Sequence, residues 1–432
     1  MRSTKHRRLL IGALLALFLV SEATGTPQRP RARDLGVPFD GTPGPLNAIT
    51  DVAGVEVGHA TIVTGSGPLV VGEGPVRTGV TAVWPRGKDD PAPVFAAWFA
   101  LNGDGEMTGT TWVQDSGLME GPFMITNTLS VGIVHHAVVR WGARKSVDYD
   151  GPGYPPWLAA LPVVAETWDG TLNDILGQHV TEQHALAALA DAHGGRVQEG
   201  NVGGGTGMIC HQFKGGIGTA SRLVEVAGAR YVVGVLVQCN YGLRSQLRVA
   251  GVPVGREITD LMPARPQGEV GWAARAKAPN RASQVAIGPG VSPSGRHGPG
   301  SGLEQEQGSI IVLAATDAPV LPHQLKRIAR RISLGLARNG SVSGNGSGDI
   351  FMALSTANSA AALSRHSSAE LKMLANEELG RLFAATVQAT EEAIINAMVA
   401  AETMTGAGDV TVFALPHDRL RTILRQYNRL VE

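Results

Sequence analysis

Short apolar runs alternate with glycine-rich turns along most of the chain. Each run has the length of a strand, and several are apolar at consecutive positions, which is typical of sheets that are covered on both faces. We therefore expect strands within six segments: AITDVAGVEVGHATIV, GVTAVWP, PVFAAWFAL, PFMITNTLSVGIV, RYVVGVLVQCNYG and SIIVLAAT.

Helical periodicity appears later in the chain. In PHQLKRIARRISLGLARNG the apolar residues have the spacing of one helix face, and Asn339-Gly340 supplies a stop signal. The residues on this face are Leu325, Ile328, Ile332 and Leu336. A second apolar series, from about Glu370 to Thr403, predicts one or two long amphipathic helices. Together the two kinds of pattern predict an α/β or α+β fold built in layers.

One stretch, from Ala264 to Gln307, has no sustained period and is crowded with Gly, Pro, Ser and Arg. So long a structureless stretch inside a compact domain indicates a functional loop, a linker or disorder. It leads into Gly308-Ser309, directly at the start of the apolar run SIIVLAAT. We therefore expect a flexible inserted tract that ends where the chain is cut.

The amino terminus has the pattern of a secretory signal. MRSTKHRR is basic, LLIGALLALFLV is apolar, and SEATG offers small residues for cleavage near Ala23 or Gly25. The apolar part is shorter than the roughly 20 residues that a membrane span needs, although an uncleaved anchor is the alternative. We therefore expect a secreted or periplasmic protein that is free of the membrane once the signal is removed.

The composition is that of a globular protein, with 43% hydrophobic and 17% charged residues among 432. Lys+Arg and Asp+Glu both number 37, so no overall field would recruit nucleic acid. The histidines lack metal-ligand spacing, and GNVGGGTGM lacks the ending of a phosphate-binding loop, so no metal or other cofactor is expected. Export would allow Cys210 and Cys239 to pair, but two unpaired core cysteines fit the sequence equally well.

The dipeptide Gly308-Ser309 has the chemistry needed to cut its own backbone. The Ser309 hydroxyl can attack the Gly308 carbonyl carbon through a five-membered ring, which converts the amide into an ester that water hydrolyses. Gly308 lacks a Cβ and can adopt a strained backbone that exposes this carbonyl. The new amino-terminal serine carries a hydroxyl beside an α-amine, and an amine of ordinary pKa, about 7.7–8.0, can accept the hydroxyl proton.

The dipeptide alone does not establish this chemistry, because Gly-Ser pairs are common in turns and a polar residue at a strand start is the alternative. Three other pairs occur nearby: Gly300-Ser301, Gly340-Ser341 and Gly346-Ser347.

Nine segments in a fixed order add specific information: NAITDVAGVEVGH, NGDGEMTGT, PFMITNTLSVG, PVVAETWDGTLND, GNVGGGTGM, VGVLVQCNYG, GSIIVLAATDAPVLPHQLKRIARR, SGDIFMALSTAN and NAMVAAETMTG. Together they resemble the L-aminopeptidase/D-esterase and β-aminopeptidase family of self-processing N-terminal-nucleophile hydrolases. The resemblance runs from about Asp34 to the end, apart from the 264–307 tract, which is longer than the family leads us to expect. It implies an αββα sandwich, self-cleavage between Gly308 and Ser309, and a homo-oligomer of processed units.

The implied organisation has three parts. Residues 1–25 are the signal peptide, 26–308 form an α chain that contains the inserted tract, and 309–432 form a β chain that begins with the nucleophile Ser309. The α and β chains are expected to stay associated after the cut.

The resemblance also implies roles for further residues. Ser347 and Asp349, in GNGSGDIF, match the family's second serine and its acidic partner, which is commonly Glu. Ser347 could pass a proton between the α-amine, the Ser309 hydroxyl and the leaving amine, while Asp349 orients it. Two local caps in a glycine-rich turn are the alternative. Asn240 in QCNYG matches the oxyanion-hole amide, and the alternative is a turn asparagine.

Two residues of PVVAETWDGTLND are candidates for the substrate site, and both have alternatives. Trp168 stands where some members carry a tyrosine that joins the oxyanion hole, so its indole could donate there or wall the pocket. Glu166 could bind the substrate's ammonium group, or it is a solvated carboxylate at a strand end. On the predicted carboxyl-terminal helix, the adjacent Glu391 and Glu392 diverge, which favours a solvated face.

These assignments predict a serine aminopeptidase or amidase that releases N-terminal residues from short peptides, amides or esters, including β-amino acid or D-alanine derivatives. An acyltransferase of the ornithine acetyltransferase type is an alternative. Enzymes of that type look cytoplasmic and use a threonine nucleophile, so Ser309 and the predicted signal peptide argue against it. The other alternative, a non-enzymatic extracytoplasmic binding protein, would remain a single chain on a denaturing gel.

Overall fold

The computed structural model describes residues 29–432 except 152–154, 156, 159–160, 227, 265–306 and 360–367. The predicted signal peptide and nearly all of the predicted 264–307 tract therefore lie outside the described residues. Both ends of the tract are held by backbone pairing. Ala264 exchanges hydrogen bonds with Thr411, and Gln307 opens strand β11 beside Gly346.

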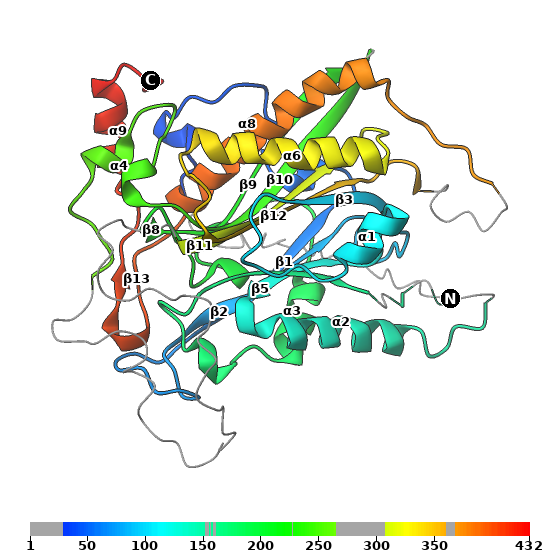
Figure 1. The fold of residues 1–432 in the computed structure, drawn as a ribbon, viewed down its shortest axis with the longest axis horizontal. Helices are drawn as coiled ribbons and strands as arrows, with labels where there is room; N and C mark the ends of the chain where they lie inside the picture. The colour runs from blue at the N-terminus through cyan, green and yellow to red at the C-terminus, as the bar shows by residue number, and fades with distance from the viewer. Residues whose placement is uncertain are drawn as a thin grey trace, which may run out of the picture.

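Two β-sheets lie face to face at the centre of the molecule (Figure 1). One has six strands in the order β4-β3-β12-β11-β10-β9, and the other has four in the order β1-β2-β5-β6. Within these sheets, β11 runs parallel to β12 and β5 runs parallel to β6, whereas the other neighbours are antiparallel. The six strands of the larger sheet are β3 Val94–Ala100, β4 Leu118–Met119, β9 Gly216–Val226, β10 Ala229–Asn240, β11 Gln307–Thr316 and β12 Gly346–Ser355. Those of the smaller are β1 Glu56–Thr64, β2 Val76–Trp84, β5 Phe123–Asn127 and β6 Val163–Thr167.

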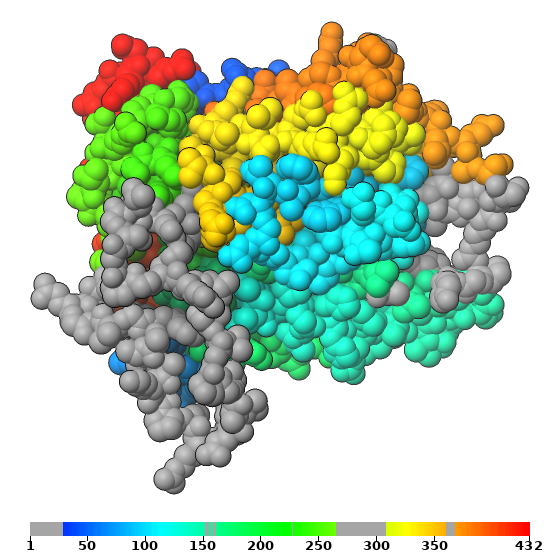
Figure 2. Space-filling view, viewed as in Figure 1, coloured from blue at the N-terminus to red at the C-terminus, as the bar shows by residue number. Residues whose placement is uncertain are grey.

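Helices cover the outer face of each sheet. Helices α6 (Pro322–Arg338) and α8 (Leu379–Val399) pack on the six-stranded sheet, and α2 (Val131–Lys145) and α3 (Glu182–Asp191) pack on the four-stranded sheet (Figure 1). The space-filling view shows α6 in yellow over the upper part of one face and α2 over its lower part (Figure 2). This order of helix, sheet, sheet and helix confirms the αββα sandwich expected from the sequence.

Smaller elements complete the fold: α1 Thr110–Ser116, α4 Val254–Glu257, α9 His417–Gln426, β7 Ile209–Cys210, β8 Phe213–Lys214, β13 Met404–Thr405 and β14 Thr411–Val412. In the part of the chain that the structure describes, no helix combines the length and the apolar character needed to cross a membrane.

The hydrophobic core follows the layers. Strand β11 shows why its sequence is apolar at consecutive positions: Ile310 and Val312 pack toward α6 and α8, whereas Ile311 and Leu313 pack between the sheets. Both faces of this strand are therefore buried, as the sequence predicts. Helix α6 also begins and ends where predicted, with its expected apolar face buried.

The helix predicted from about Glu370 begins later than expected, at Leu379. Leu371 is 44% exposed, and the backbone at Leu374 is held by Pro319, whose carbonyl accepts its N–H, and by Gln324, which donates to its carbonyl. These tertiary hydrogen bonds replace the helical ones that an apolar pattern alone would favour.

The interpretation of Glu391-Glu392 as a solvated face is wrong for Glu392, whose side chain is wholly buried. Its carboxylate accepts hydrogen bonds from Arg33, Arg222 and Asn47 and closes an ion-pair network between the amino-terminal segment, β9 and α8. Arg33 lies 359 positions away in sequence, so local helix geometry could not predict its partner.

Candidate active site

Ser309 lies on β11, in the middle of the six-stranded sheet, where it is only 5% exposed. Ser309 is paired in the strand register with Asn240 on β10 and with Gly348 on β12. The backbone N–H of Gly348 donates a hydrogen bond to the Ser309 Oγ at 3.0 Å. The serine is thus held at the end of two neighbouring strands, with its hydroxyl oriented by a backbone donor.

The residue before Ser309 must be a glycine in this structure. Gly308 has φ of +140°, a conformation that residues with a Cβ rarely adopt. A Cβ at this position would also overlap the carbonyl oxygen of Asn240 and lie 3.1 Å from the Cα of Tyr241. The close approach of β10 therefore selects glycine independently of any chemistry at the bond to Ser309.

Ser347 and Asp349 lie on strand β12, so their interpretation as caps in a turn is wrong. Both are fully buried, and Ser347 Oγ donates to Asp349 Oδ1 at 2.7 Å. The strand register places Ser347 beside Gly308, which carries the carbonyl of the bond that we expect to be cut.

The direct contact expected between Ser347 and Ser309 is not among the hydrogen bonds of the described residues in the uncleaved chain. Ser309 is paired with Gly348, and side chains alternate between the two faces of a strand. Ser309 therefore shares the inter-sheet face with Ile311, whereas Ser347 and Asp349 share the helix-facing side with Phe351. The backbone nitrogen of Ser309 lies in the strand itself, between these two faces.

Asn240 is the last residue of β10, and both ends of its amide are oriented. Its Oδ1 accepts from the backbone N–H of Ile209 at 2.8 Å, and its Nδ2 donates to the carbonyl of Trp168 at 2.9 Å. A primary amide has two N–H donors. Among the described residues only one of these two donors has an acceptor, the Trp168 carbonyl, which fixes the orientation of the amide beside Ser309.

Glu166 lies on β6 and is only 3% exposed, so the solvated interpretation of this carboxylate is wrong. It accepts a hydrogen bond from the Glu106 N–H at 2.9 Å and another from the Thr128 hydroxyl. Burial raises the pKa of Glu166, and these two hydrogen bonds oppose the rise. The nearby acids Asp104 and Glu106 raise this pKa further, which makes the position favourable for a cation.

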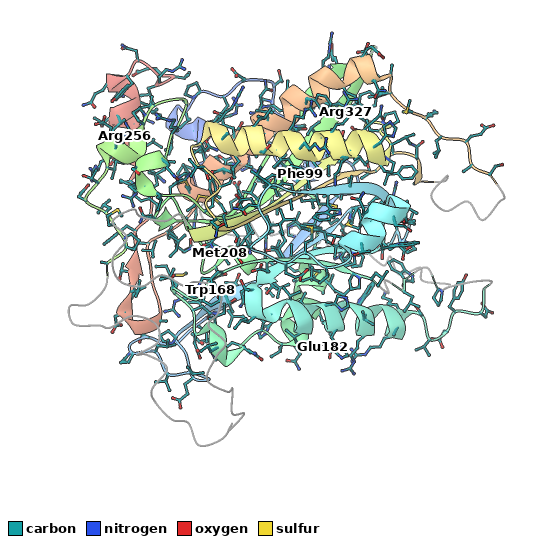
Figure 3. The ribbon with its side chains drawn as sticks, viewed as in Figure 1. Phe99, Trp168, Glu182, Met208, Arg256 and Arg327 are labelled. Atoms are coloured by element: carbon teal, nitrogen blue, oxygen red, sulfur yellow. A yellow bond between two sulfur atoms is a disulfide. The ribbon has the colours of Figure 1, made fainter. Side chains whose placement is uncertain are left out.

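Trp168, two residues further on, contacts Asn240 through its backbone carbonyl and is partly buried. Figure 3 shows Trp168 and Met208 at the same end of the two sheets. The indole of Trp168 faces Gly170, where a Cβ would lie 2.6 Å from the ring. The structure thus places Trp168 at the site, and the hydrogen bond it makes there does not use the indole.

The loop that follows β3 forms part of the site, and sequence reasoning assigned it no role. A Cβ at Gly348 would lie 2.5 Å from the Asp104 carbonyl oxygen and 2.7 Å from the Gly105 Cα, so this loop packs directly on the residue beside Ser309. A Cβ at Gly105 would in turn lie 3.3 Å from Glu166 Oε1. The glycines of the motif NGDGEMTGT, which the family resemblance already included, could have indicated this close approach.

The glycine-rich segment GNVGGGTGM packs between the sheets, where its glycines allow a close approach of the backbone. A Cβ at Gly204 would overlap the side chain of Gln238, and one at Gly205 would overlap the backbone of Ile217. The segment continues into Ile209, whose N–H orients Asn240. It therefore forms a wall of the site from its backbone.

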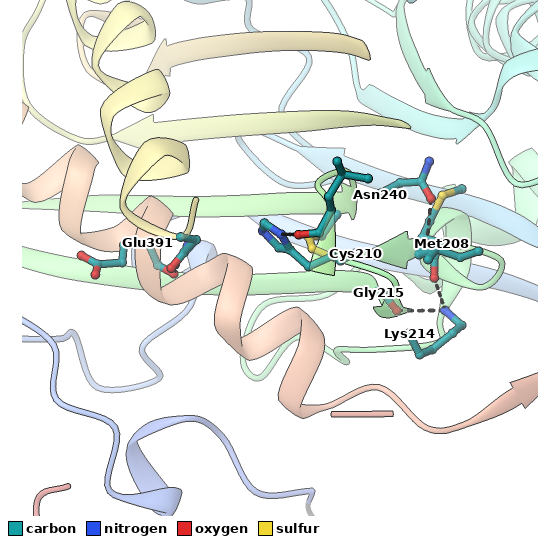
Figure 4. Close-up of a disulfide and its surroundings, with 11 residues drawn as sticks. Met208, Cys210, Lys214, Gly215, Asn240 and Glu391 are labelled. Carbon is teal, nitrogen blue, oxygen red and sulfur yellow. Dashed lines mark hydrogen bonds between the residues drawn. A yellow bond between two sulfur atoms is a disulfide. The ribbon is translucent and has the colours of Figure 1, made fainter. Parts of the chain in front are cut away.

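The open question of the two cysteines is settled by the structure, which joins Cys210 and Cys239 in a disulfide with a Cα–Cα distance of 5.7 Å (Figure 4). Cys239 precedes Asn240, and Cys210 follows Ile209. The disulfide therefore links β7, which carries the Ile209 N–H, to β10, which carries Asn240. Across the described residues there is no group of three or more side chains suited to hold a metal ion.

Comparison with known proteins first identifies similar sequences. The profile of peptidase family S58 matches residues 47–412. The chain is 50% identical over 430 residues to a β-peptidyl aminopeptidase, BapA, of Sphingosinicella microcystinivorans, covering 100% of this chain and 99% of that protein.

Two solved structures also superimpose on most of the chain. One is an L-aminopeptidase D-Ala-esterase/amidase from Ochrobactrum anthropi, described as a serine aminopeptidase and a variant of the Ntn-hydrolase fold. It gives a TM-score of 0.79 at 45% identity and covers 93% of this chain and 100% of its own. The other is a β-aminopeptidase from a Burkholderia species, with a TM-score of 0.74 at 41% identity and coverage of 92% and 99%.

Proposed function

The chain belongs to peptidase family S58, and we propose that it cuts itself between Gly308 and Ser309 and then uses Ser309 to release β-amino acids from the N-termini of short peptides and amides. It is an aminopeptidase with an Ntn-hydrolase fold. The observation that carries the proposal for its mechanism is the position of Ser309. This serine follows an obligatory glycine and lies between an oriented amide, Asn240, and a backbone donor, Gly348.

In the self-cleavage that we propose, Ser309 Oγ attacks the carbonyl carbon of Gly308 and the bond from that carbon to the Ser309 nitrogen breaks. The hydroxyl proton passes to the departing nitrogen, which becomes the α-amine of Ser309. The available N–H of Asn240 stabilises the negative charge on the carbonyl oxygen during the attack. Water then hydrolyses the Gly308 ester and leaves the Gly308 carboxylate and the free hydroxyl.

In turnover the same hydroxyl attacks the first carbonyl of the substrate, and the α-amine accepts its proton. The proton then passes to the leaving amine, and a water molecule hydrolyses the acyl-enzyme. The new α-amine stands where the strand register places Ser347, at the former peptide bond. The Ser347–Asp349 pair can therefore orient the amine and exchange a proton with it, even though it faces the other side of the sheet from the Ser309 hydroxyl.

Glu166 is the group proposed to hold the substrate's ammonium. Its carboxylate is buried and belongs to the opposite sheet, and Gly105, in the loop that follows β3, lies close to both Glu166 and Gly348. An ammonium group placed there would be paired with Glu166, with Asp104 and Glu106 adding to the negative potential. Such a site requires a substrate with a free amino group, which is the property of an aminopeptidase substrate.

The preference for β-amino acids is a finer proposal. It is supported by the relationship to the Sphingosinicella β-peptidyl aminopeptidase, which spans the whole chain at 50% identity. The relationship to the Ochrobactrum enzyme makes L-α-residues and D-alanine esters or amides the competing substrates. We also propose export by the signal at residues 1–25 and assembly of the cut chains into a homo-oligomer, both from the sequence and the family resemblance.

Intact-mass measurement tests the cut. Cleavage at Gly308–Ser309 leaves a carboxyl-terminal chain of 124 residues (432 − 308), whereas cleavage at Gly346–Ser347 would leave 86 (432 − 346). Ser309→Ala should remain one chain and hydrolyse no substrate, and a cut or active Ser309→Ala protein would contradict the proposal.

Substrate preference is tested by comparing β-alanyl, L-alanyl and D-alanyl amides on the processed enzyme. The β-alanyl amide should have the highest kcat/KM, and a matched amide that lacks the amino group should be turned over at least 100-fold more slowly, because it cannot form the ion pair with Glu166 that we propose for the substrate. Equal turnover of that amide would remove Glu166 from the substrate site.

A further inference from the structure

A two-stranded hairpin lies beneath the oriented amide of Asn240. Strand β7 pairs with β8 so that Ile209 is opposite Lys214 and Cys210 is opposite Phe213. The hairpin supplies the Ile209 N–H that holds Asn240 Oδ1 at 2.8 Å. Its position is fixed at one side by the disulfide from Cys210 to Cys239.

The side chain of Lys214 is wholly buried inside this hairpin. Its Nζ donates to the carbonyl oxygens of Met208 at 2.8 Å, Gly215 at 2.9 Å and Gly205 at 3.4 Å, and Figure 4 shows the first two bonds. An ammonium group has three N–H donors, so the three carbonyls use all of them. Among the described residues Lys214 forms no ion pair, and its polar partners are these three carbonyl groups.

The carbonyl of Met208 and the N–H of Ile209 belong to one peptide group. Lys214 therefore binds the oxygen of the same planar unit whose N–H orients Asn240. The N–H of Gly215 donates to the same oxygen at 2.9 Å, so this carbonyl has two donors. Hydrogen bonds in a chain polarise one another. The bond from Lys214 to the Met208 carbonyl therefore makes the Ile209 N–H a stronger donor to Asn240.

Filling space alone does not explain a lysine at this position. Burial lowers the pKa of Lys214 to about 7, which shows that the surroundings oppose its charge. An apolar side chain of similar length would avoid that cost but would leave the three carbonyl oxygens without the Lys214 donor. What the ammonium supplies, and an apolar chain cannot, is a fixed orientation for the Met208–Ile209 peptide.

We propose that Lys214 is a positioning residue for the oxyanion site, which acts through the Met208–Ile209 peptide to hold the amide of Asn240 toward Ser309. This inference rests on the proposed role of Asn240 as the oxyanion donor. It predicts that the effect of Lys214 on catalysis exists only while Asn240 is present.

The experiment is a double-mutant cycle between Lys214→Met and Asn240→Ala. Each protein is incubated until the 124-residue chain has formed, and kcat and KM for a β-alanyl amide are expressed per mole of that chain. Lys88→Met is the matched control, because Lys88 also donates to a carbonyl, that of Ala190 at 2.9 Å, but lies outside the site. Lys214→Gln, which retains two N–H donors, is the second variant if the methionine chain does not fold.

We expect Lys214→Met to lower kcat about 10-fold to 100-fold with less than a threefold change in KM, and Lys214→Gln to lower it less. In the Asn240→Ala background the lysine substitution should change kcat by less than twofold. Lys88→Met should keep the kcat of the unaltered enzyme.

Two results would overturn the inference. One is an unchanged kcat in folded, processed Lys214 variants. The other is the same loss of kcat with and without Asn240, which would show that Lys214 only stabilises the fold. If Asn240→Ala alone leaves kcat unchanged, the proposed role of Asn240 fails instead. The kcat of the Asn240→Ala single variant therefore distinguishes a failure of the proposed function from a failure of the inference about Lys214.

Discussion

Replacing Gly308 by alanine isolates the geometry on which the proposed self-cleavage depends. The φ of +140° costs an alanine about 1–3 kcal/mol of backbone strain. Its Cβ would also overlap the Asn240 carbonyl, and such overpacking costs a further ~1–3 kcal/mol because β10 must move. The free energy of unfolding should therefore fall by about 2–6 kcal/mol.

The matched control is Gly72→Ala. Gly72 also has a positive φ, +88°, but a Cβ there would meet no atom within 4 Å. It should lose only the strain, about 1–3 kcal/mol. Both substitutions are measured by urea unfolding in the Ser309→Ala background, where the chain stays in one piece.

The same substitution should slow self-cleavage when Ser309 is present. Moving the end of β10 displaces Asn240, and loss of one oxyanion donor typically slows such reactions by about 10²–10³-fold. The rate is followed by the appearance of the 124-residue chain in intact-mass spectra (432 − 308). Equal destabilisation by the two alanine substitutions, or normal cleavage of Gly308→Ala, would refute the argument that close packing of β10 on Gly308 sets up the cut.

Three further predictions concern the groups around Ser309. Asp349→Asn should keep the fold but lower kcat by orders of magnitude, because Ser347 loses the carboxylate that accepts its hydrogen bond and orients it; unchanged kcat would return Asp349 to a structural role. Burial raises the pKa of Glu166, so its protonation should lower kcat/KM from a pH above the ordinary Glu value of about 4.3, because a protonated Glu166 cannot pair with ammonium; Glu166→Gln should keep only the fall in kcat/KM that protonation of the Ser309 α-amine causes. Joint replacement of Cys210 and Cys239 by serine should lower both the Tm and kcat, since their disulfide flanks Ile209 and Asn240, and a fall in Tm alone would separate the disulfide from catalysis.

The pattern of apolar residues was sufficient to predict those helices and strands whose formation depends on neighbouring residues in the sequence. The apolar spacing of α6 and its Asn339-Gly340 stop predicted a helix whose bounds and buried face the structure reproduces. The continuous apolar run of β11 predicted a strand covered on both faces, because a strand can be apolar at consecutive positions only if both sides are buried. The ordered motifs were specific enough to indicate the family and its four layers.

The site residues illustrate a second kind of sequence information. Ser309 was suggested by the chemistry of Gly308-Ser309 and supported by the resemblance, Asn240 was identified by the resemblance, and Glu166 was a candidate from its place two residues before Trp168. The structure brings all three to one end of the sheets. It also separates the Ser309 side chain from Ser347, because the register pairs Ser309 with Gly348, and no count along the sequence can determine the register between two strands.

Burial and pairing of charges were decided only by the tertiary structure. Glu392 has the sequence context of a solvated helix position, yet its partner Arg33 comes from the other end of the chain. Lys214 stands in a short polar-looking segment and drew no attention, because its three acceptors are backbone carbonyls that no side-chain pattern reveals. Periodicity reports which face of an element is buried, whereas the charge that a buried group can keep depends on the dipoles and ions that folding brings around it.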